Sequence, residues 1–136
     1  MSVAAIKSYG MMPVARFRVE GDSFQIEITD AGLAQEERCI YAFVIGDDIV
    51  RIGSSKAKLA TRLGAWRRDV SAAFQNRRSP TSQNEADGWK AALGNTEGMI
   101  FARTGTIVIT PVGEISAYLD EECVLIARHR PRFCRR

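Results

Sequence analysis

The chain has 136 residues, of which 46% are hydrophobic and 26% are charged, and its formal net charge is +3 at pH 7. This length suits one globular domain, and the composition excludes an extensively disordered chain. No apolar run approaches the about 18 residues that cross a bilayer, and no signal peptide is recognisable, so we expect no membrane association. Three cysteines without CxxC spacing favour a reducing cytoplasm over a disulfide framework or a cysteine zinc site.

The first expected elements are two hairpins. Residues 15–19 and 24–29 alternate apolar and polar side chains around a Glu-Gly-Asp turn, which predicts the first. Residues 30–38 are polar and predict a connector or a short helix. Residues 39–45 and 49–53 are rich in β-branched and aromatic side chains and predict the second hairpin.

Helices are expected next. Residues 56–74 predict a helix because apolar residues recur at steps of three and four, at Leu59, Leu63, Trp66, Val70 and Phe74. Residues 76–84 have the composition of a loop, and residues 85–93 predict a short helix that ends at Gly94. Trp66 and Trp89 are expected in the core.

The C-terminal part predicts a strand and a final helix. Residues 99–110 are strand-like, with Gly105 either dividing them into a hairpin or marking a bulge. Thr110-Pro111 resembles a helix cap followed by a first-turn proline, so we expect the last helix to run from there to about His129. Pro131 stops it.

Basic residues are concentrated in two segments. Residues 51–78 hold eight basic residues and one acid, and residues 128–136 hold five arginines, one histidine and no acid. Such segments in an otherwise near-neutral chain are typical of a protein that binds a phosphate-rich partner. A solvated helix face with a basic tail would give the same pattern, so charge alone leaves both interpretations open.

The register of the second hairpin determines whether Tyr41 and Arg51 can act together. A three-residue turn at 46–48 would pair Ile45 with Ile49, Phe43 with Arg51 and Tyr41 with Gly53, which places Tyr41 and Arg51 on one face. A two-residue turn would shift the register and send Arg51 to the opposite face. We expect the three-residue turn.

Two charged residues border apolar stripes of the predicted helices. Arg62 lies between Leu59 and Trp66, so its guanidinium could reach toward Tyr41 and a phosphate; a snorkelling surface arginine is the alternative. Glu122 lies on the stripe of Ile115, Tyr118, Leu125, Ile126 and His129. A buried carboxylate is costly unless it is paired or binds a cation, so a salt bridge to an arginine and a metal site both remain open. The neighbouring Glu121 is expected in solvent.

This ordered set of residues resembles the GIY-YIG nuclease superfamily. Ile40-Tyr41 in CIY matches the GIY strand, and Ile52-Gly53 in RIG matches the YIG strand. Arg62 matches the helix arginine of the family, and Glu122 in ECVLI matches its metal-ligand glutamate. The resemblance covers residues 39–134 and implies a nuclease domain at 39–136, with residues 1–38 as an N-terminal hairpin extension packed on it.

The fold that the resemblance implies is α/β, with a small three-stranded antiparallel sheet flanked by helices. The implied activity is hydrolysis of phosphodiester bonds in DNA with one divalent metal ion, Mg²⁺ or Mn²⁺, held by Glu122. Tyr41 would orient or deprotonate the attacking water, and Arg62 would neutralise charge on the scissile phosphate. Arg51 replaces the tyrosine of YIG and would be a second phosphate contact or a water positioner.

Further expectations concern DNA contacts and departures from the family pattern. Nucleic-acid contacts are expected from Lys56, Lys58, Arg67, Arg77, Arg78 and His129, the last as a cation favoured by the helix dipole or as a structural residue. Ser54 and Ser55 are expected to cap the following helix or to contact phosphate. Cys134 replaces a polar residue, usually Asn, and is expected to lack its two hydrogen bonds.

Three functional hypotheses therefore remain. The first is an endonuclease, for which cleavage of both strands would require a homodimer or two successive binding events. The second is a catalytically weakened or inactive nucleic-acid-binding module of the same fold, because of Arg51 and Cys134. The third is a protein-interaction domain with a basic surface.

Overall fold

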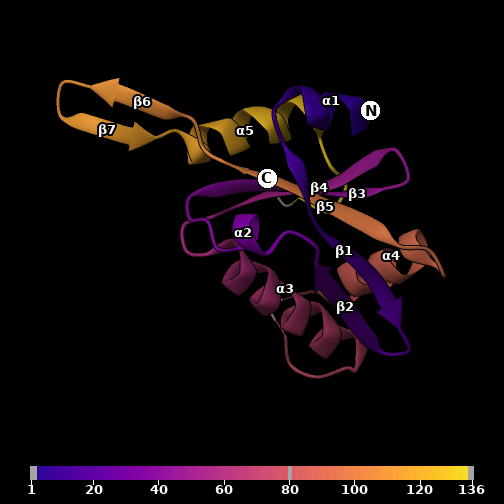
Figure 1. The fold of residues 1–136 in the computed structure, drawn as a ribbon. Coiled ribbons are helices and arrows are strands. Elements are labelled where there is room, and N and C mark those ends of the chain that lie inside the picture. The colour runs from indigo at the N-terminus through magenta and orange to yellow at the C-terminus, as the bar shows by residue number, and fades with distance from the viewer. Residues whose placement is uncertain (1–2, 80, 135–136) are drawn as a thin grey trace.

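The computed structural model describes residues 3–79 and 81–134, within which the chain forms five helices and seven strands (Figure 1). Five strands form one antiparallel sheet in the order β2-β1-β5-β3-β4. Their bounds are β1 (Met12–Glu20), β2 (Ser23–Ile28), β3 (Cys39–Ile45), β4 (Asp48–Ser55) and β5 (Gly98–Thr104). The sheet expected to have three strands has five, because the N-terminal hairpin joins it through pairing of β1 with β5.

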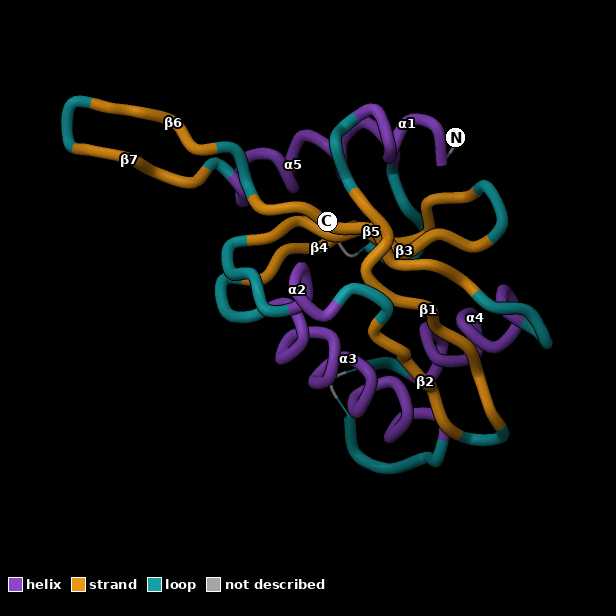
Figure 2. Tube along the Cα trace, in the orientation of Figure 1, coloured by secondary structure: helices purple, strands orange, loops and turns teal. Residues whose placement is uncertain are grey.

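Helices cover both faces of this sheet, so the fold is α+β (Figure 2). One face carries α1 (Val3–Ser8) and α5 (Tyr118–His129), and the other carries α2 (Ala31–Ala34), α3 (Leu59–Phe74) and α4 (Gln83–Leu93). Each face has its own buried cluster, and successive residues of β3 alternate between them. Within the described residues, no helix combines the length and apolar character that crossing a bilayer requires.

Helix α3 confirms the predicted apolar stripe, because all five of its stripe residues are buried. The helix begins at Leu59 and not at residue 56: the Leu59 N–H donates to the carbonyl of Glu36, and Lys58 caps without a side-chain hydrogen bond. The expected serine cap is therefore wrong. Helix α4 has a serine cap instead, in which the Ser82 hydroxyl accepts from the Glu85 N–H.

The expected start of the last helix is wrong. Residues Ile107–Thr110 form β6 and Gly113–Ser116 form β7, and these strands pair as a separate two-stranded hairpin. Pro111 lies in the connecting turn, where its fixed φ is as suitable as in the first turn of a helix. Helix α5 begins only at Tyr118, so Ile115 belongs to β7 and not to the helix stripe.

The β3–β4 hairpin reaches the expected pairing by an unexpected route. Ile45 pairs with Asp48 across a two-residue turn, so the expected three-residue turn is wrong. The register then shifts beyond Val44, which restores the predicted pairs of Phe43 with Arg51 and Tyr41 with Gly53. A β-bulge at this point leaves one residue of β4 extra and returns Arg51 to the face of Tyr41.

Candidate functional site

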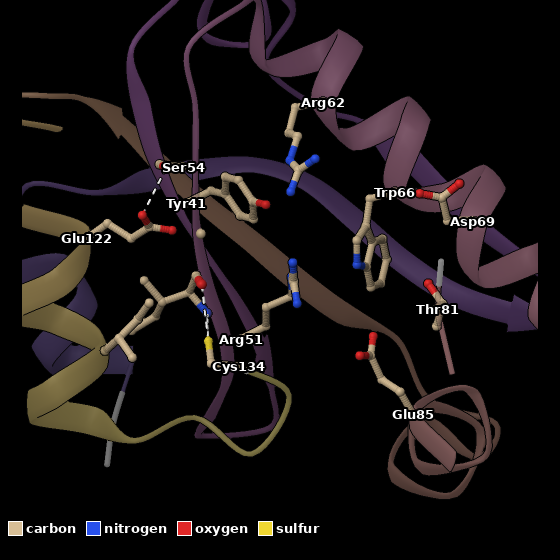
Figure 3. A pocket seen from close by; sticks show the side chains of 13 residues that line it. Tyr41, Arg51, Ser54, Arg62, Trp66, Asp69, Thr81, Glu85, Glu122 and Cys134 are labelled. Carbon is tan, nitrogen blue, oxygen red and sulfur yellow. Dashed lines mark hydrogen bonds between the residues drawn. The ribbon is translucent and has the colours of Figure 1, made fainter. Parts of the chain in front are cut away.

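A cavity of about 300 Å³ opens beside β4, which is an edge strand of the sheet (Figure 3). Its walls include all four residues that the sequence predicts to be catalytic: Tyr41, Arg51, Arg62 and Glu122. These residues belong to four different elements, β3, β4, α3 and α5. The fold therefore brings side chains that are far apart in the sequence to one cavity at the sheet edge.

Tyr41 lies flat across Gly53 on the neighbouring strand. A Cβ atom at residue 53 would lie 2.4 Å from the phenol oxygen, so only glycine leaves room for the ring. This contact is the physical reason for the glycine of RIG. The phenol oxygen is buried and has no hydrogen-bond partner among the described residues. Figure 3 shows it pointing into the cavity, between the guanidinium groups of Arg62 and Arg51.

Arg51 is held from two sides. Its Nη1 donates to the carbonyl of Phe133 at 3.0 Å, and its guanidinium carbon lies 5.9 Å from the ring centroid of Trp66. Its Nε–H is buried and has no hydrogen-bond partner within the described chain. Arg62, by contrast, is exposed on α3 at the other end of the phenol. The cavity thus holds one constrained guanidinium and one exposed one.

Glu122 is buried, with 5% of its surface exposed. The Ser54 hydroxyl donates to its Oε1 at 3.0 Å, across from β4 to α5. Ser55 donates instead to the carbonyl of Ala57. The carboxylate faces the same cavity as the ring of Tyr41, as the nuclease hypothesis requires.

The neighbouring Glu121 is not the solvated residue expected from the sequence. It forms an ion pair with Arg103 and accepts hydrogen bonds from the backbone N–H and the hydroxyl of Thr106. Burial alone would raise the pKa of Glu121, but these hydrogen bonds outweigh it and the net shift is downward. Glu121 and Glu122 are adjacent on α5 but have different environments: Glu121 binds Arg103 and Thr106, and Glu122 faces the cavity.

The opposite wall of the cavity is acidic, which sequence reasoning missed. Asp69 of α3 and Glu85 of α4 line it together with Thr81 and Trp66. Two signals could have indicated them: Asp69 follows Trp66 by three residues, and Ser82 with Glu85 forms the S-x-x-E pattern of a capping box. The cavity is thus basic at one end and acidic at the other.

The C-terminal segment crosses the edge of β4 from one face of the sheet to the other. The Phe133 N–H donates to the carbonyl of Val50, and the Phe133 ring stacks on Trp89 at 4.2 Å between centroids. The Cys134 sulfur accepts from the Ile52 N–H and donates to its carbonyl, both at 3.1 Å. The Cys134 thiol thus makes two hydrogen bonds to the backbone of β4, both weaker than those of an amide side chain.

Five of the six residues expected to contact nucleic acid lie just before α3, on it or in the loop after it. Lys56 lines a depression next to the cavity that also includes Ser54 and Arg62. Arg67 and Arg77 line a second depression, together with Arg68. Lys58 and Arg78 are exposed at the start of α3 and in the loop that follows it.

His129 lies apart from this surface. Its Nε2 is 2.9 Å from the phenol oxygen of Tyr9, with which it shares a hydrogen bond. Burial, together with the nearby Arg128, lowers the pKa of His129. The neutral ring is therefore favoured, and the cation expected from the helix dipole is not.

The residues of the cavity suit a hard divalent cation. No group of three or more His, Cys, Asp or Glu side chains suited to a metal ion occurs in the described ranges 3–79 and 81–134. Glu122 nevertheless offers a buried carboxylate beside the Ser54 hydroxyl. Mg²⁺ is commonly held by one or two carboxylates and completes its shell with water and substrate phosphates, so the donor set fits.

Comparison with known proteins supports the fold. No protein-family model matches the sequence, and neither does any curated protein. Among solved structures, a mutant of EndoII from bacteriophage T4 matches with a TM-score of 0.65 and 18% identity, covering 96% of each chain. The restriction endonuclease Hpy188I in complex with product DNA matches with a TM-score of 0.58 and 14% identity, covering 100% of this chain and 87% of the other. Both are GIY-YIG nucleases, so the predicted resemblance is confirmed and the chain has the GIY-YIG nuclease fold.

Proposed function

We propose that the protein is a metal-dependent endonuclease that hydrolyses phosphodiester bonds in DNA. The observation that carries the proposal is the convergence, in one cavity, of a buried carboxylate, a buried phenol and two guanidiniums. Arginine, tyrosine and glutamate together supply what phosphodiester hydrolysis needs: charge neutralisation, a water-positioning group and a cation ligand. The complex of Hpy188I with product DNA makes DNA the natural substrate class to test.

The roles follow from the positions of the side chains. The phenol oxygen of Tyr41 has no partner within the described chain, so it is available to position the attacking water and, as the phenolate, to take its proton. Arg62, exposed beside it, neutralises charge on the phosphate as the new P–O bond forms and the old one breaks. Glu122 would hold the divalent cation, Mg²⁺ or Mn²⁺, and the chemistry supplied there would be stabilisation of charge on the leaving oxygen.

Arg51 is assigned the second phosphate contact. Its Nη1 is committed to the carbonyl of Phe133, but its Nε–H remains buried without a partner among the described residues. A phosphate oxygen would satisfy that donor. Asp69 and Glu85 make the far end of the cavity unfavourable for phosphate, so the scissile group is expected between Arg51 and Arg62.

DNA outside the cavity is expected to follow α3. Lys56 and Lys58 lie just before this helix, and Arg67, Arg77 and Arg78 lie further along it and in the next loop. Such contacts bind the phosphate backbone and position the duplex without reading its sequence. His129 is not assigned to this path, because it is hydrogen-bonded to Tyr9 and outside the cavity.

A second candidate function is a nucleic-acid-binding module with weak or no catalysis. The observation that favours it is the immobilisation of Arg51, where the family has a tyrosine, by Phe133 and Trp66. An arginine held in this way binds phosphate well but replaces a group that could exchange a proton.

The test is cleavage of supercoiled plasmid and of branched DNA by the purified protein with Mg²⁺ or Mn²⁺, with and without EDTA. Glu122→Gln keeps the shape of the buried side chain and removes its charge, and we expect cleavage to fall at least about 100-fold. Asp120→Asn is the matched control, because it removes one charge from an exposed residue of the same helix. We expect this control to cleave like the wild type.

Other outcomes separate the alternatives. Salt-sensitive DNA binding by both Glu122→Gln and the wild type, with no cleavage by either, would favour the binding module. Cleavage that survives in Glu122→Gln would exclude this carboxylate from the reaction. Absence of any DNA affinity would leave the protein-interaction domain as the remaining hypothesis.

A further inference from the structure

The ring of Phe133, close to the end of the described chain, packs against α4. It stacks on Trp89 with 4.2 Å between the ring centroids and an interplanar angle of 25°. It also fills the space beside Gly88, where a Cβ atom would lie 2.8 Å from the ring's Cε1. Glycine in the interior of a helix is unfavourable relative to alanine, so its presence in α4 is explained by the ring that it admits.

The backbone of Phe133 is bonded to two consecutive residues of β4. Its N–H donates to the carbonyl of Val50 at 2.9 Å. Its own carbonyl accepts from Nη1 of Arg51 at 3.0 Å. The place of this carbonyl is therefore set by the ring on α4 and by the backbone of β4 together, and the carbonyl in turn sets the place of the Arg51 side chain.

Four contacts form a closed circuit that begins and ends at Phe133. Its ring stacks on Trp89, and the Trp89 ring packs edge-on against Trp66 with 5.1 Å between centroids. The guanidinium carbon of Arg51 lies over the Trp66 ring at 5.9 Å, and Nη1 of Arg51 returns to the carbonyl of Phe133. No member of such a circuit can move without disturbing two contacts, so the guanidinium is held more tightly than by either contact alone.

The two groups that hold the guanidinium of Arg51 are neutral. A backbone carbonyl and an indole ring orient a cation without cancelling its charge, whereas a carboxylate would cancel it. The Nε–H of Arg51 is buried and has no partner among the described residues, and the side chain lines the cavity between Tyr41 and Trp66 (Figure 3). The guanidinium is therefore oriented for an anion before any anion is bound.

We propose that Phe133 is a positioning residue, whose ring fixes the carbonyl that directs the Nε–H of Arg51 at the phosphate. The proposal rests on the proposed function, because the phosphate in question is the scissile group of the DNA. Phe133 itself does not line the cavity, so it acts through Arg51. Donors that are fixed in advance stabilise the charge of a transition state without reorganising, and a long arginine side chain gains most from such support.

The first measurement is nitrogen NMR of the arginine side chains in labelled protein, which does not depend on cleavage. Arg51→Lys identifies the Arg51 signal by its loss. In the wild type, we expect the Nε–H of Arg51 to exchange slowly with solvent, and added inorganic phosphate to shift its signal. In Phe133→Ala, the exchange should be at least about 10-fold faster, as when a hydrogen bond of a charged donor is lost, and the shift with phosphate should be smaller.

Phe74→Ala is the matched control. It removes the same ring from the same buried cluster, but the Phe74 ring packs on Phe24 with 6.1 Å between centroids and not on the Phe133 segment. The exchange of the Arg51 Nε–H should therefore stay as in the wild type. Phe133→Leu and Phe74→Leu repeat the comparison with milder substitutions, in case an alanine variant does not fold. Equal exchange rates in the variants of both positions would overturn the proposal.

The second measurement is the rate of cleavage at saturating DNA in a single turnover. Phe133→Ala should cleave about 10- to 100-fold more slowly because the guanidinium is misplaced. Its affinity for DNA should change little, since most phosphate contacts are expected outside the cavity. In an Arg51→Ala background, the same substitution should cost nothing further.

The outcomes separate this proposal from the nuclease proposal. A loss of rate that is equal with and without Arg51 would show that Phe133 serves the fold only, and would overturn the positioning role. A wild type that cleaves no DNA would count against the nuclease. The exchange and phosphate measurements would still decide whether Phe133 directs Arg51 at an anion.

Discussion

The contact between Tyr41 and Gly53 allows the effect of Gly53→Ala to be worked out from the structure. The added Cβ would lie 2.4 Å from the phenol oxygen and 2.5 Å from Cζ. Ordinary contacts between such atoms begin near about 3.5 Å, so the ring must move by about 1 Å. Overpacking of this kind costs about 1–3 kcal/mol in the free energy of unfolding. A misplacement of about 1 Å in a catalytic group lowers the cleavage rate by about 100-fold.

A double-mutant cycle in urea measures this contact independently of activity. Gly53→Ala should destabilise the wild type but be nearly neutral in a Tyr41→Ala background, where there is no ring to displace. The control is Gly64→Ala on α3, where the added Cβ meets only a flexible arginine nitrogen at 3.5 Å; it should stabilise by about 0.5–1 kcal/mol. An equal cost of Gly53→Ala with and without the ring would refute the reasoning, as would undiminished cleavage by Gly53→Ala if the wild type is a nuclease.

Four further predictions follow from contacts already described. Cys134→Ala should lower the free energy of unfolding by about 1 kcal/mol, and Cys134→Asn should recover it, as urea denaturation will show; equal stability of all three proteins would contradict this. The pKa of Glu121 is lowered in the folded state, so the stability that its carboxylate confers is complete above the ordinary pKa of 4.5 and is lost as the pH falls through the lowered value. In Glu121→Gln, the midpoint of urea unfolding should therefore fall less steeply as the solution is acidified. An unchanged dependence on pH would count against the network with Arg103. Burial lowers the pKa of His129, so its ring binds a proton less readily in the folded state than in the unfolded chain. The free energy of unfolding should therefore decline as the pH falls below the ordinary pKa of 6.5. If the wild type and His129→Gln depend on pH in the same way, this prediction is wrong. Arg67→Ala should weaken DNA binding equally for all sequences and reduce the slope of log K against log salt by about one, whereas a sequence-dependent loss would show a base contact.

The sequence predicts the parts of this fold whose signals are local. The apolar stripe of α3 and the alternation in both N-terminal strands repeat over several residues, so periodicity identifies these elements, although β1 begins at Met12 and not at residue 15. The five-stranded sheet could not be predicted in this way, because the pairing of β1 with β5 joins residues that are more than eighty positions apart, such as Phe17 and Gly98. Thr110-Pro111 was ambiguous for another reason, since the same two residues suit a helix start and a hairpin turn.

The candidate site was also only partly predictable from the sequence. Tyr41, Arg62 and Glu122 could be selected because each lies on or beside an apolar pattern and matches a family motif. Asp69 and Glu85 each carry a local sequence signal, but their meeting in one acidic wall could not be predicted, because they belong to separate helices and come together only through the packing of α3 on α4. The bulge in β4 could not be predicted either. Neither a two-residue nor a three-residue turn alone gives the observed register, which needs a two-residue turn together with one extra residue in β4.

The crossing of β4 by the last described residues has a practical consequence. A bulky group or a mechanical load attached beyond Cys134 would act directly on the strand that carries Arg51 and Gly53, because the thiol and Phe133 are bonded to that strand's backbone. The same group attached ahead of Val3 would meet α1, on the face of the sheet away from the Tyr41 ring. Affinity handles, fluorophores and surface tethers are therefore best placed at the N-terminal side, where they leave the cavity undisturbed.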